Sequence, residues 1–309
     1  MKILVTGGAG FIGSHIVEAA VVEGEEVAVV DDLSAGVESN VPAGVPLYKI
    51  DIRSEDLADV LAEVKPEVVC HQAAQMNVTF SVSQPRTDAD INIIGSLNLL
   101  ELCVRCGVKK IVYASSSGAV YGEPASLPVT EATPPAPVSH YGASKLSVEH
   151  YLSVYAGVYG LDYTILRYAN VYGPRQLRHG EAGVAPILFS ELVEGRKPTL
   201  YGMGEPVRDY VFARDVARAN MLALKNGSRE CFNIASGKGT SVRQLFDKIA
   251  KLVGVDVEPA LKPLRNGEVH SIYASVEKAR EKLNWRPMVD LDEGLRATYE
   301  FFCRQRAGL

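Results

Sequence analysis

The chain has 309 residues, of which 47% are hydrophobic and 22% are charged, with a formal net charge of -5. This length allows a large buried core and lies near the size at which chains divide into two lobes. The mild negative charge provides no long-range attraction to nucleic acid or to an anionic membrane, and no apolar run reaches the roughly 18 residues of a membrane span. We therefore expect neither class of partner.

Cysteine and histidine usage bears on the compartment and on metals. The five cysteines are an odd number at scattered positions, which is typical of a reduced, cytoplasmic protein. The sequence begins directly with a strand-like run, so we expect no signal peptide. The six histidines show no metal-ligand spacing, and we expect no metal.

Strand-like and helix-like segments alternate through the first half of the chain. The apolar runs that predict strands are 2–6, 26–30, 45–50, 68–71, 110–115 and 162–168, and helical periodicity covers 13–22, 54–64, 92–106 and 141–158. Alternation with continuous Val, Ile and Leu runs predicts an α/β fold, a doubly wound parallel sheet covered by helices on both faces.

The second half of the chain is less regular. Five prolines in 122–139 predict a loop, with Ser139 as the N-cap of the following helix. Beyond residue 168 the alternation weakens, although one strand near 229–236 is expected to return to the main sheet. We therefore expect a large domain over 1–168 and a smaller α/β C-terminal lobe over 169–309, with a cleft between them.

Glycines cluster where the first strand gives way to the first helix, in "TGGAGFIG". Gly7, Gly10 and Gly13 suit a tight turn and close approach of the backbone to a pyrophosphate at the helix N-terminus. Asp31 ends the second strand 21 residues after Gly10, where a carboxylate accepts hydrogen bonds from a ribose 2′-hydroxyl and repels a 2′-phosphate. The pattern favours NAD over NADP, in a sheet of the Rossmann type.

Tyr141 and Lys145 lie four residues apart in a predicted helix and so share one face. A tyrosine that acts as a base near neutral pH needs its pKa lowered by roughly three units, which corresponds to about 4 kcal/mol. The charge of a nearby lysine supplies about 3 kcal/mol of this energy. The positive charge of an oxidised nicotinamide would supply the remainder. The serines of "ASSSGAVYG" end another strand at the same edge of the sheet, where they are placed to bind a substrate oxygen.

With these three motifs the chain resembles the extended short-chain dehydrogenase/reductases, and among them the UDP-glucose 4-epimerases and close nucleotide-sugar epimerases. The resemblance covers nearly the whole chain. It includes "VVDDL", "HQAA", "NIIGSLNLL", "LRYANVYGPRQ", "RDYVFARD" and "KLNWRP".

The resemblance implies an NAD-binding domain over 1–168 and a lobe over 169–309 that mainly binds the nucleotide-sugar. The catalytic set would be Ser117, Tyr141 and Lys145. The other residues matched to the cofactor are Gly7, Gly10, Phe11, Ile12, Gly13, Asp31, Asp32, Leu33, Ser34, Gly36, Asp51, Ile52, Gln72, Ala73, Ala74, Asn92, Ser115 and Tyr168. Those matched to the substrate, beside Ser117 and Tyr141, are Asn170, Val184, Tyr201, Arg208, Arg265, Glu268 and Ile272.

The implied reaction is 4-epimerisation of a UDP-sugar. Tyr141 would remove the proton of the sugar 4-hydroxyl while the C4 hydride passes to NAD, with Ser117 bonded to the same oxygen. The 4-keto sugar would then turn over, and the hydride would return to its other face. A homodimer is expected through the helices of 92–106 and 141–158, with an apolar stripe of Tyr151, Val154, Tyr155 and Val158.

Several alternatives stay open. Related dehydratases and decarboxylases need acids that "SSG" (116–118) lacks. The intact set of Ser117, Tyr141 and Lys145 argues against a non-catalytic NAD-binding protein, and a simple NAD-dependent reductase is the main remaining enzyme alternative. A UDP-glucuronate epimerase would need carboxylate recognition, for which Arg178 is the candidate. Ile272 stands where relatives often have a bulky tyrosine, so the smaller side chain would favour admission of an N-acetyl group at the sugar 2-position.

Overall fold

The computed structural model describes residues 1–176, 183–265 and 268–306, and within them seven strands form one fully parallel sheet. Their spatial order is β10-β6-β5-β4-β1-β2-β3. The strands are β1 (Lys2–Thr6), β2 (Glu26–Val30), β3 (Leu47–Tyr48), β4 (Val68–His71), β5 (Lys110–Ser116), β6 (Asp162–Tyr168) and β10 (Glu230–Ile234). The doubly wound parallel sheet predicted from the sequence is confirmed.

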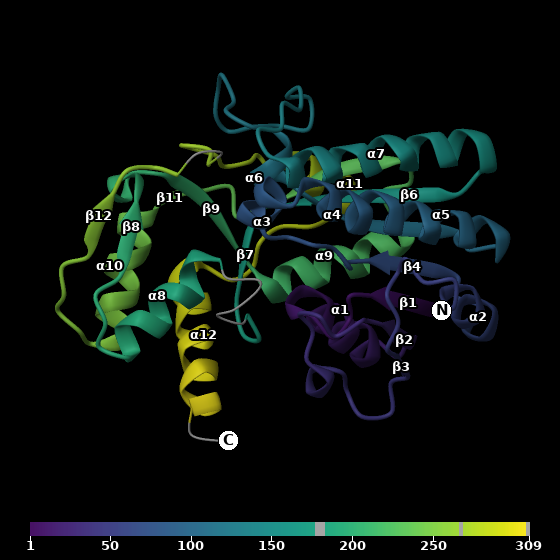
Figure 1. Ribbon diagram of the computed structural model, residues 1–309, viewed down its shortest axis with the longest axis horizontal. Helices are drawn as coiled ribbons and strands as arrows, with labels where there is room; N and C mark the ends of the chain where they lie inside the picture. Colours follow the sequence, from purple (N-terminus) through teal and green to yellow (C-terminus); the bar gives the residue numbers. More distant parts are fainter. Residues whose placement is uncertain (177–182, 266–267, 307–309) are drawn as a thin grey trace.

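Helices cover both faces of this sheet (Figure 1). Strand side chains alternate between two cores, so that Ile3 and Val5 face one side while Leu4 faces the other. The first core packs against α1 (Phe11–Val22), α9 (Ala213–Lys225) and α11 (Glu277–Leu283). The second packs against α2 (Leu57–Val64), α5 (Gly95–Arg105) and α7 (His140–Tyr159).

Eight helices and strands from the second half of the chain, within the described residues, form what we call the small lobe, seen at the left of Figure 1. In the described part of the chain it holds the mixed sheet β11-β9-β7 and the parallel pair β12-β8. Its own core joins α8, α10 and α12 to these strands. The bounds are β7 (Asn170–Tyr172), α8 (Val184–Val193), β8 (Thr199–Tyr201), β9 (Val207–Phe212), β11 (Gly239–Ser241), α10 (Val242–Val253), β12 (Ala260–Lys262) and α12 (Leu291–Arg306).

Two segments that follow residue 168 return to the large domain, one as a strand of its sheet and one as a helix packed on it. Strand β10 pairs with β6 along its whole length, and α9 packs against α1. The same core also contains the fully buried ring of Trp285. The chain therefore passes back and forth between the large sheet and the small lobe.

The segment between β4 and α5 contains several short helices, and the single helix expected over 92–106 begins later, at Gly95. The segment holds α3 (Val78–Ser83), α4 (Pro85–Ala89) and a π-helical turn over Asp90–Ile94 before α5 begins. A Cβ on Gly95 would lie 2.8 Å from the Ile52 side chain, so this helix passes close to the loop after β3. The short helix α6 (Ser117–Val120) follows β5 directly.

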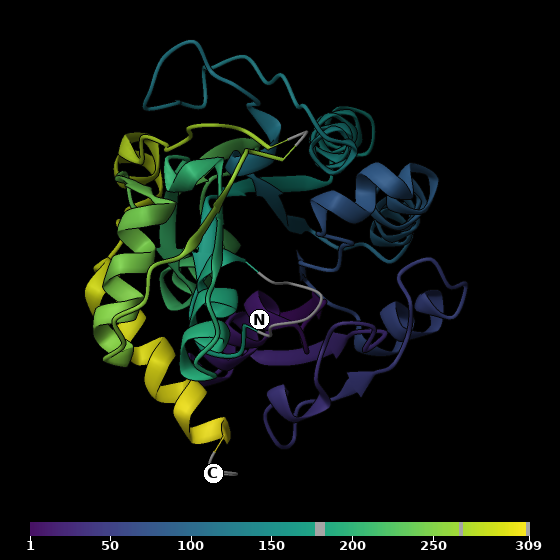
Figure 2. The ribbon, with the colours of Figure 1, turned by 60° about the vertical axis from the view of Figure 1, so that its left-hand side comes forward.

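The proline-rich segment 122–139 contains no helix or strand and projects from the body of the chain above α6 and α7 (Figures 1 and 2). At its end the Ser139 hydroxyl accepts a hydrogen bond from the Gly142 amide at 3.1 Å, as the sequence predicts for an N-cap. The cap fixes where α7 begins, and so fixes the first turn that carries Tyr141.

Candidate active site

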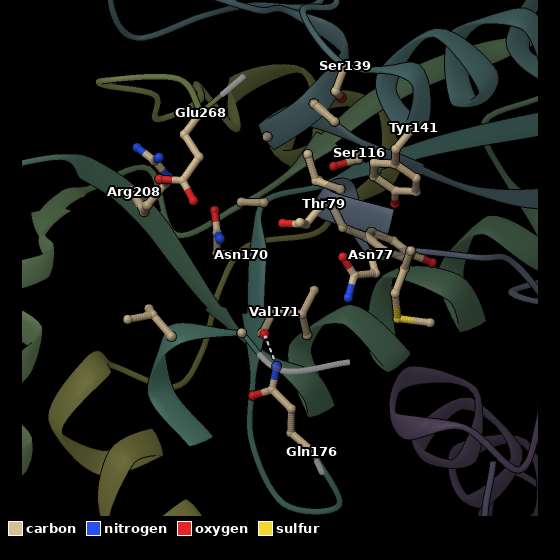
Figure 3. Close-up of a pocket in the computed structure, with 18 of the residues that line it drawn as sticks. Asn77, Thr79, Ser116, Ser139, Tyr141, Asn170, Val171, Gln176, Arg208 and Glu268 are labelled. Atoms are coloured by element: carbon tan, nitrogen blue, oxygen red, sulfur yellow. Dashed lines mark hydrogen bonds between the residues drawn. The ribbon is translucent and has the colours of Figure 1, made fainter. Parts of the chain in front are cut away.

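A cavity of about 1260 Å³ lies between the carboxyl ends of the parallel strands and the small lobe. Residues from both sides line it, from the glycine turn after β1 to Val269, which follows β12. Figure 3 shows Tyr141 and Ser116 on one side of this space and Arg208 and Glu268 on the other, with Asn170 between them. Ligands of open α/β sheets bind at this edge.

The glycine turn has no room for side chains. Gly7 adopts φ +69°, and a Cβ there would lie 2.6 Å from the Ala73 amide nitrogen. A Cβ on Gly13 would lie 2.0 Å from the Gly7 carbonyl oxygen. Gly10 is the N-cap of α1 and has no side chain to bond the free amides of the first turn. The turn thus leaves a bare helix N-terminus facing the cavity, which suits a pyrophosphate.

Asp31 directly follows β2, lies beside this turn and is 7% exposed. Its two oxygens accept hydrogen bonds from the backbone amides of Ala9 and Leu33, each at 2.9 Å. Burial raises the pKa of the carboxyl, while these amides act in the opposite direction. Each oxygen keeps a further lone pair for a ribose hydroxyl. The backbone of Gly36 packs against the same carboxylate, since a Cβ on this residue would lie 2.7 Å from an Asp31 oxygen.

The other residues predicted for the cofactor fall into two groups. Those that line the cavity are Gly7, Gly10, Phe11, Ile12, Gly13, Gln72, Ala74, Ser115, Tyr141, Lys145 and Tyr168. Those outside its lining are Asp31, Asp32, Leu33, Ser34, Gly36, Asp51, Ile52, Ala73 and Asn92.

Side chains in the second group are held by protein partners. Asp32 accepts hydrogen bonds from the Ser34 amide and hydroxyl, and Asp51 forms an ion pair with Arg53. Asn92 bonds both backbone groups of Gln75 at 2.8 Å.

Tyr141 and Lys145 both line the cavity from the first turns of α7. The Lys145 Nζ lies 5.9 Å from the centre of the Tyr141 ring and donates a hydrogen bond to the Ala114 carbonyl at 3.0 Å. It also lies 5.1 Å from the centre of the Tyr113 ring. The predicted common face is therefore present.

Burial shifts the pKa values of both residues of this pair toward their neutral forms. Burial raises the pKa of Tyr141 above its ordinary value, the charge of Asp88 raises it further, and the Ser116 hydroxyl only partly opposes them. Burial also lowers the pKa of Lys145 to about 8, against the charges of Asp88 and Glu149. Burial therefore outweighs the neighbouring charges for both groups, and the expectation that Lys145 and an oxidised nicotinamide together acidify the phenol stays a prediction.

The structure also departs from the expectation for the serines. Ser116, at the end of β5, lines the cavity and bonds Tyr141, whereas Ser117 is 2% exposed and begins α6. Strand residues alternate in direction, so Ser116 points away from the side taken by Ser115, whose hydroxyl donates to Glu149. Ser117 follows the change from strand to helix and is not among the residues that line the cavity.

The predicted substrate residues gather at the small-lobe side. Asn170, Val184, Tyr201, Arg208, Arg265 and Glu268 line the cavity. The guanidinium of Arg208 donates to the carbonyls of residues 207, 269 and 270, and burial lowers its pKa. That of Arg265 lies 3.7 Å from the centre of the Tyr201 ring and 3.6 Å from a Glu268 oxygen. Two cations are thus fixed at one end of the cavity.

Two further residues predicted for the substrate are not found among the described residues that line the cavity. Ile272 is 3% exposed and packs in a hydrophobic cluster with Val120, Tyr121 and Val129, outside the cavity lining, while Val269 nearby does line it. The inference about the sugar 2-position therefore loses its basis. Arg178 lies outside the described residues.

Sequence reasoning predicted Gln72, Ala73 and Ala74 directly after β4 but missed residues 76–79. Met76, Asn77 and Thr79 line the cavity, and Figure 3 shows Asn77 and Thr79 on the side of Tyr141 and Ser116. Asn77 also caps α3, accepting a hydrogen bond from the Phe80 amide at 2.9 Å. The available signal was topological, since a loop that follows a parallel strand opens at the same edge as the glycine turn.

No helix in the described ranges is both long and apolar enough to cross a membrane. In the same ranges no three His, Cys, Asp or Glu side chains are grouped as a metal site would need.

Comparison with known proteins gives consistent matches over the whole chain. Residues 3–235 match the profile of the NAD dependent epimerase/dehydratase family. A putative UDP-glucose 4-epimerase of Methanocaldococcus jannaschii is 46% identical over 95% of this chain and 96% of its own.

Two solved structures are similar throughout. The UDP-glucose 4-epimerase of Thermotoga maritima with UDP-glucose has a TM-score of 0.97 and 47% identity, covering 99% of this chain and 100% of its own. That of Thermus thermophilus in complex with NAD has a TM-score of 0.93 and 44% identity, covering 98% and 99%.

Proposed function

Because this chain belongs to the NAD dependent epimerase/dehydratase family, we propose that it interconverts the C4 epimers of a UDP-sugar. It is an isomerase that uses NAD. The observation that carries the proposal is one cavity shared by three features. These are a glycine turn with no room for a Cβ, the Tyr141–Lys145 pair, and two arginines at the opposite end.

The glycine turn and Asp31 would hold the cofactor, since the turn is bare of side chains and Asp31 retains acceptor capacity. Bound NAD supplies a hydride acceptor and donor together with the positive charge of its oxidised ring. We assign the NAD-binding domain to 1–168 with the returning strand near 229–236, and the substrate lobe mainly to the rest. Ala73 and Asn92 act indirectly, because they shape the backbone beside the turn.

Tyr141 takes the proton of the sugar 4-hydroxyl and later returns it. The Ser116 hydroxyl, rather than that of Ser117, is placed to bond the same oxygen. Lys145 holds a positive charge near the ring at 5.9 Å and so favours the phenolate. Because burial raises the pKa of Tyr141, we expect proton removal to depend on the positive charges of Lys145 and of an oxidised nicotinamide.

The arginines select the diphosphate of the substrate. Arg208 and Arg265 bring positive charge to a chain whose net charge of -5 would otherwise repel it. Glu268 accepts hydrogen bonds from the uridine ribose, and Tyr201 and Asn170 border the same space. The preferred pair is UDP-glucose and UDP-galactose, since the position of Ile272 gives no support for the N-acetylated pair.

The chain would work as a cytoplasmic homodimer. All five cysteines lie in the described ranges and are free, in keeping with a reducing compartment. Tyr151, Val154 and Val158 are 40%, 53% and 65% exposed on α7, which gives an apolar stripe for a second copy, whereas Tyr155 is buried. Light scattering of the wild type and of Val154→Glu tests this, and a wild-type monomer at micromolar concentration would refute it.

The function is tested by incubating the purified chain with UDP-glucose, UDP-galactose, UDP-N-acetylglucosamine and UDP-glucuronate, with the products resolved by NMR. We expect 4-epimers to form without added reductant and without net NADH. Tyr141→Phe should lose activity and keep its bound NAD. Net NADH formation would indicate a dehydrogenase instead, loss of water a dehydratase, and tight NAD binding without turnover a non-catalytic protein.

A further inference from the structure

A buried carboxylate with no assigned role lies behind the Tyr141–Lys145 pair. Asp88, in α4, is 0% exposed although its neighbours in the sequence "PRTDAD" are polar. A carboxylate removed from water is costly unless several donors satisfy it. Its position therefore requires a physical explanation.

Three donors from three elements surround this carboxylate. The Ser144 hydroxyl donates to Oδ2 at 2.5 Å, and the side-chain amides of Gln75 and Asn92 donate to Oδ1 at 2.6 and 3.1 Å. Ser144 directly precedes Lys145 on α7, whereas Gln75 directly precedes the cavity-lining residue Met76. Asp88 thus ties the catalytic turn of α7 to the loop after β4, which lines the same side of the cavity.

The charges around Lys145 are distributed unevenly. Glu149, on α7 itself, is paired with the Arg167 guanidinium at 2.9 and 2.5 Å, so its charge is largely balanced. Among the described residues no lysine or arginine lies at ion-pair distance from Asp88. Asp88 is therefore the carboxylate whose unbalanced charge acts on the buried ammonium.

The remaining titratable neighbours carry no charge at neutral pH. On β4, burial and the charge of Lys145 lower the pKa of His71 to about 3, and its ring nitrogens face the hydroxyls of Thr6 and Ser96. On β5, burial raises the pKa of Tyr113. The balance between burial and the carboxylates, Asp88 first and Glu149 second, thus decides whether Lys145 stays charged.

We propose that Asp88 is a positioning residue that keeps Lys145 protonated and holds the α7 turn of Tyr141 and Lys145 against the cavity. The inference rests on the proposed epimerisation. The same negative charge also opposes formation of the Tyr141 phenolate. Asp88 therefore sets both ends of the working pH range, with the ammonium lost at the alkaline end and the phenol protonated at the acid end.

The test is the pH profile of epimerisation by the NAD-loaded Asp88→Asn variant, which keeps the shape of the side chain and loses its charge. We expect both limits of the profile to move toward lower pH by about one unit. Ser144→Ala removes one hydrogen bond and keeps the charge, so its limits should match the wild type even if its rate falls. Asp88→Glu should restore the limits in part. Asp88→Asn with unmoved limits and only a lower rate would overturn the proposal.

A second measurement needs no turnover and so separates this inference from the proposed function. The ε-carbon NMR signal of Lys145, identified by its loss in Lys145→Met, should titrate near pH 8 in the wild type. In Asp88→Asn its midpoint should fall by about one unit. A chain inactive on every UDP-sugar would refute the function while this titration still decides the role of Asp88. An unchanged midpoint would refute the role even in an active enzyme.

Discussion

Replacing Lys145 with methionine is expected to abolish turnover and yet to stabilise the fold. The pKa of this lysine falls from 10.5 to about 8 on burial. Each unit corresponds to about 1.4 kcal/mol, so burying the ammonium costs the folded state about 3 kcal/mol at neutral pH. The methionine variant avoids this cost but also loses the hydrogen bond from Nζ to the Ala114 carbonyl, which lowers its stability by about 1 kcal/mol. The net gain in the free energy of unfolding is about 2 kcal/mol.

The gain must also depend on pH in one direction. Between about pH 8 and 10.5 the unfolded wild type binds more protons at this site than the folded form. Wild-type stability therefore rises with pH in that window, because the folded chain is relieved of its buried charge first. The methionine variant has no such rise from this site, so its advantage should disappear within the window and become a deficit of about 1 kcal/mol above it, the value of the lost hydrogen bond.

Urea unfolding of the NAD-free proteins measures both effects, with the buried Trp285 as the fluorescent probe. The exposed Lys251→Met is the matched control and should change stability by less than about 0.5 kcal/mol. A Lys145→Met variant that is less stable than the wild type near neutral pH would refute the reasoning. So would a stability difference that stays constant through the alkaline window.

Three further predictions concern the cofactor turn, the substrate end and the network below the site. Gly13→Ala places a methyl group 2.0 Å from a backbone carbonyl oxygen and should weaken NAD binding by about tenfold or more in calorimetry. The control Gly157→Ala, whose methyl group meets nothing within 4 Å, should bind NAD as tightly as the wild type. Arg265→Ala loses a cation stacked on a tyrosine ring, so KM for the UDP-sugar should rise about tenfold with kcat little changed; an equal fall in kcat would place the residue at the reacting centre. Glu149→Gln leaves the buried guanidinium of Arg167 without its carboxylate and should cost about 3 kcal/mol in urea unfolding. Removing both charges in Glu149→Gln/Arg167→Met should cost less than the single change, and a larger loss would contradict this account.

The sequence predicted the elements whose character depends on local pattern. Strands β1, β2, β4 and β6 have the expected bounds, since continuous apolar runs between turn residues leave little choice. The strand expected over 45–50 is shorter, because β3 (Leu47–Tyr48) lies at the edge of the sheet, where β2 is its one strand neighbour in the described ranges.

Predictions failed where the direction of a side chain depends on packing. Ser116 and Ser117 are alike in sequence, and only the change from strand to helix between them decides which one reaches the cavity. Asp88 lies in a polar segment that reads as solvent-facing, yet α4 packs against α7 and buries it. Ionisation was also beyond local reasoning, since burial outweighs the neighbouring charge for both Tyr141 and Lys145.

The path of the chain between the large sheet and the small lobe has a consequence for synthesis on the ribosome. Strand β10 closes the open edge of β6, and α9 covers α1, yet both are made after β7, α8 and β9. A nascent chain that has emerged only to Tyr168 still presents an unpaired strand edge and a bare apolar helix face. We expect stable folding of the cofactor half to wait until Ile234 has left the exit tunnel, and the emerging chain to be most exposed to chaperones and to aggregation before that point.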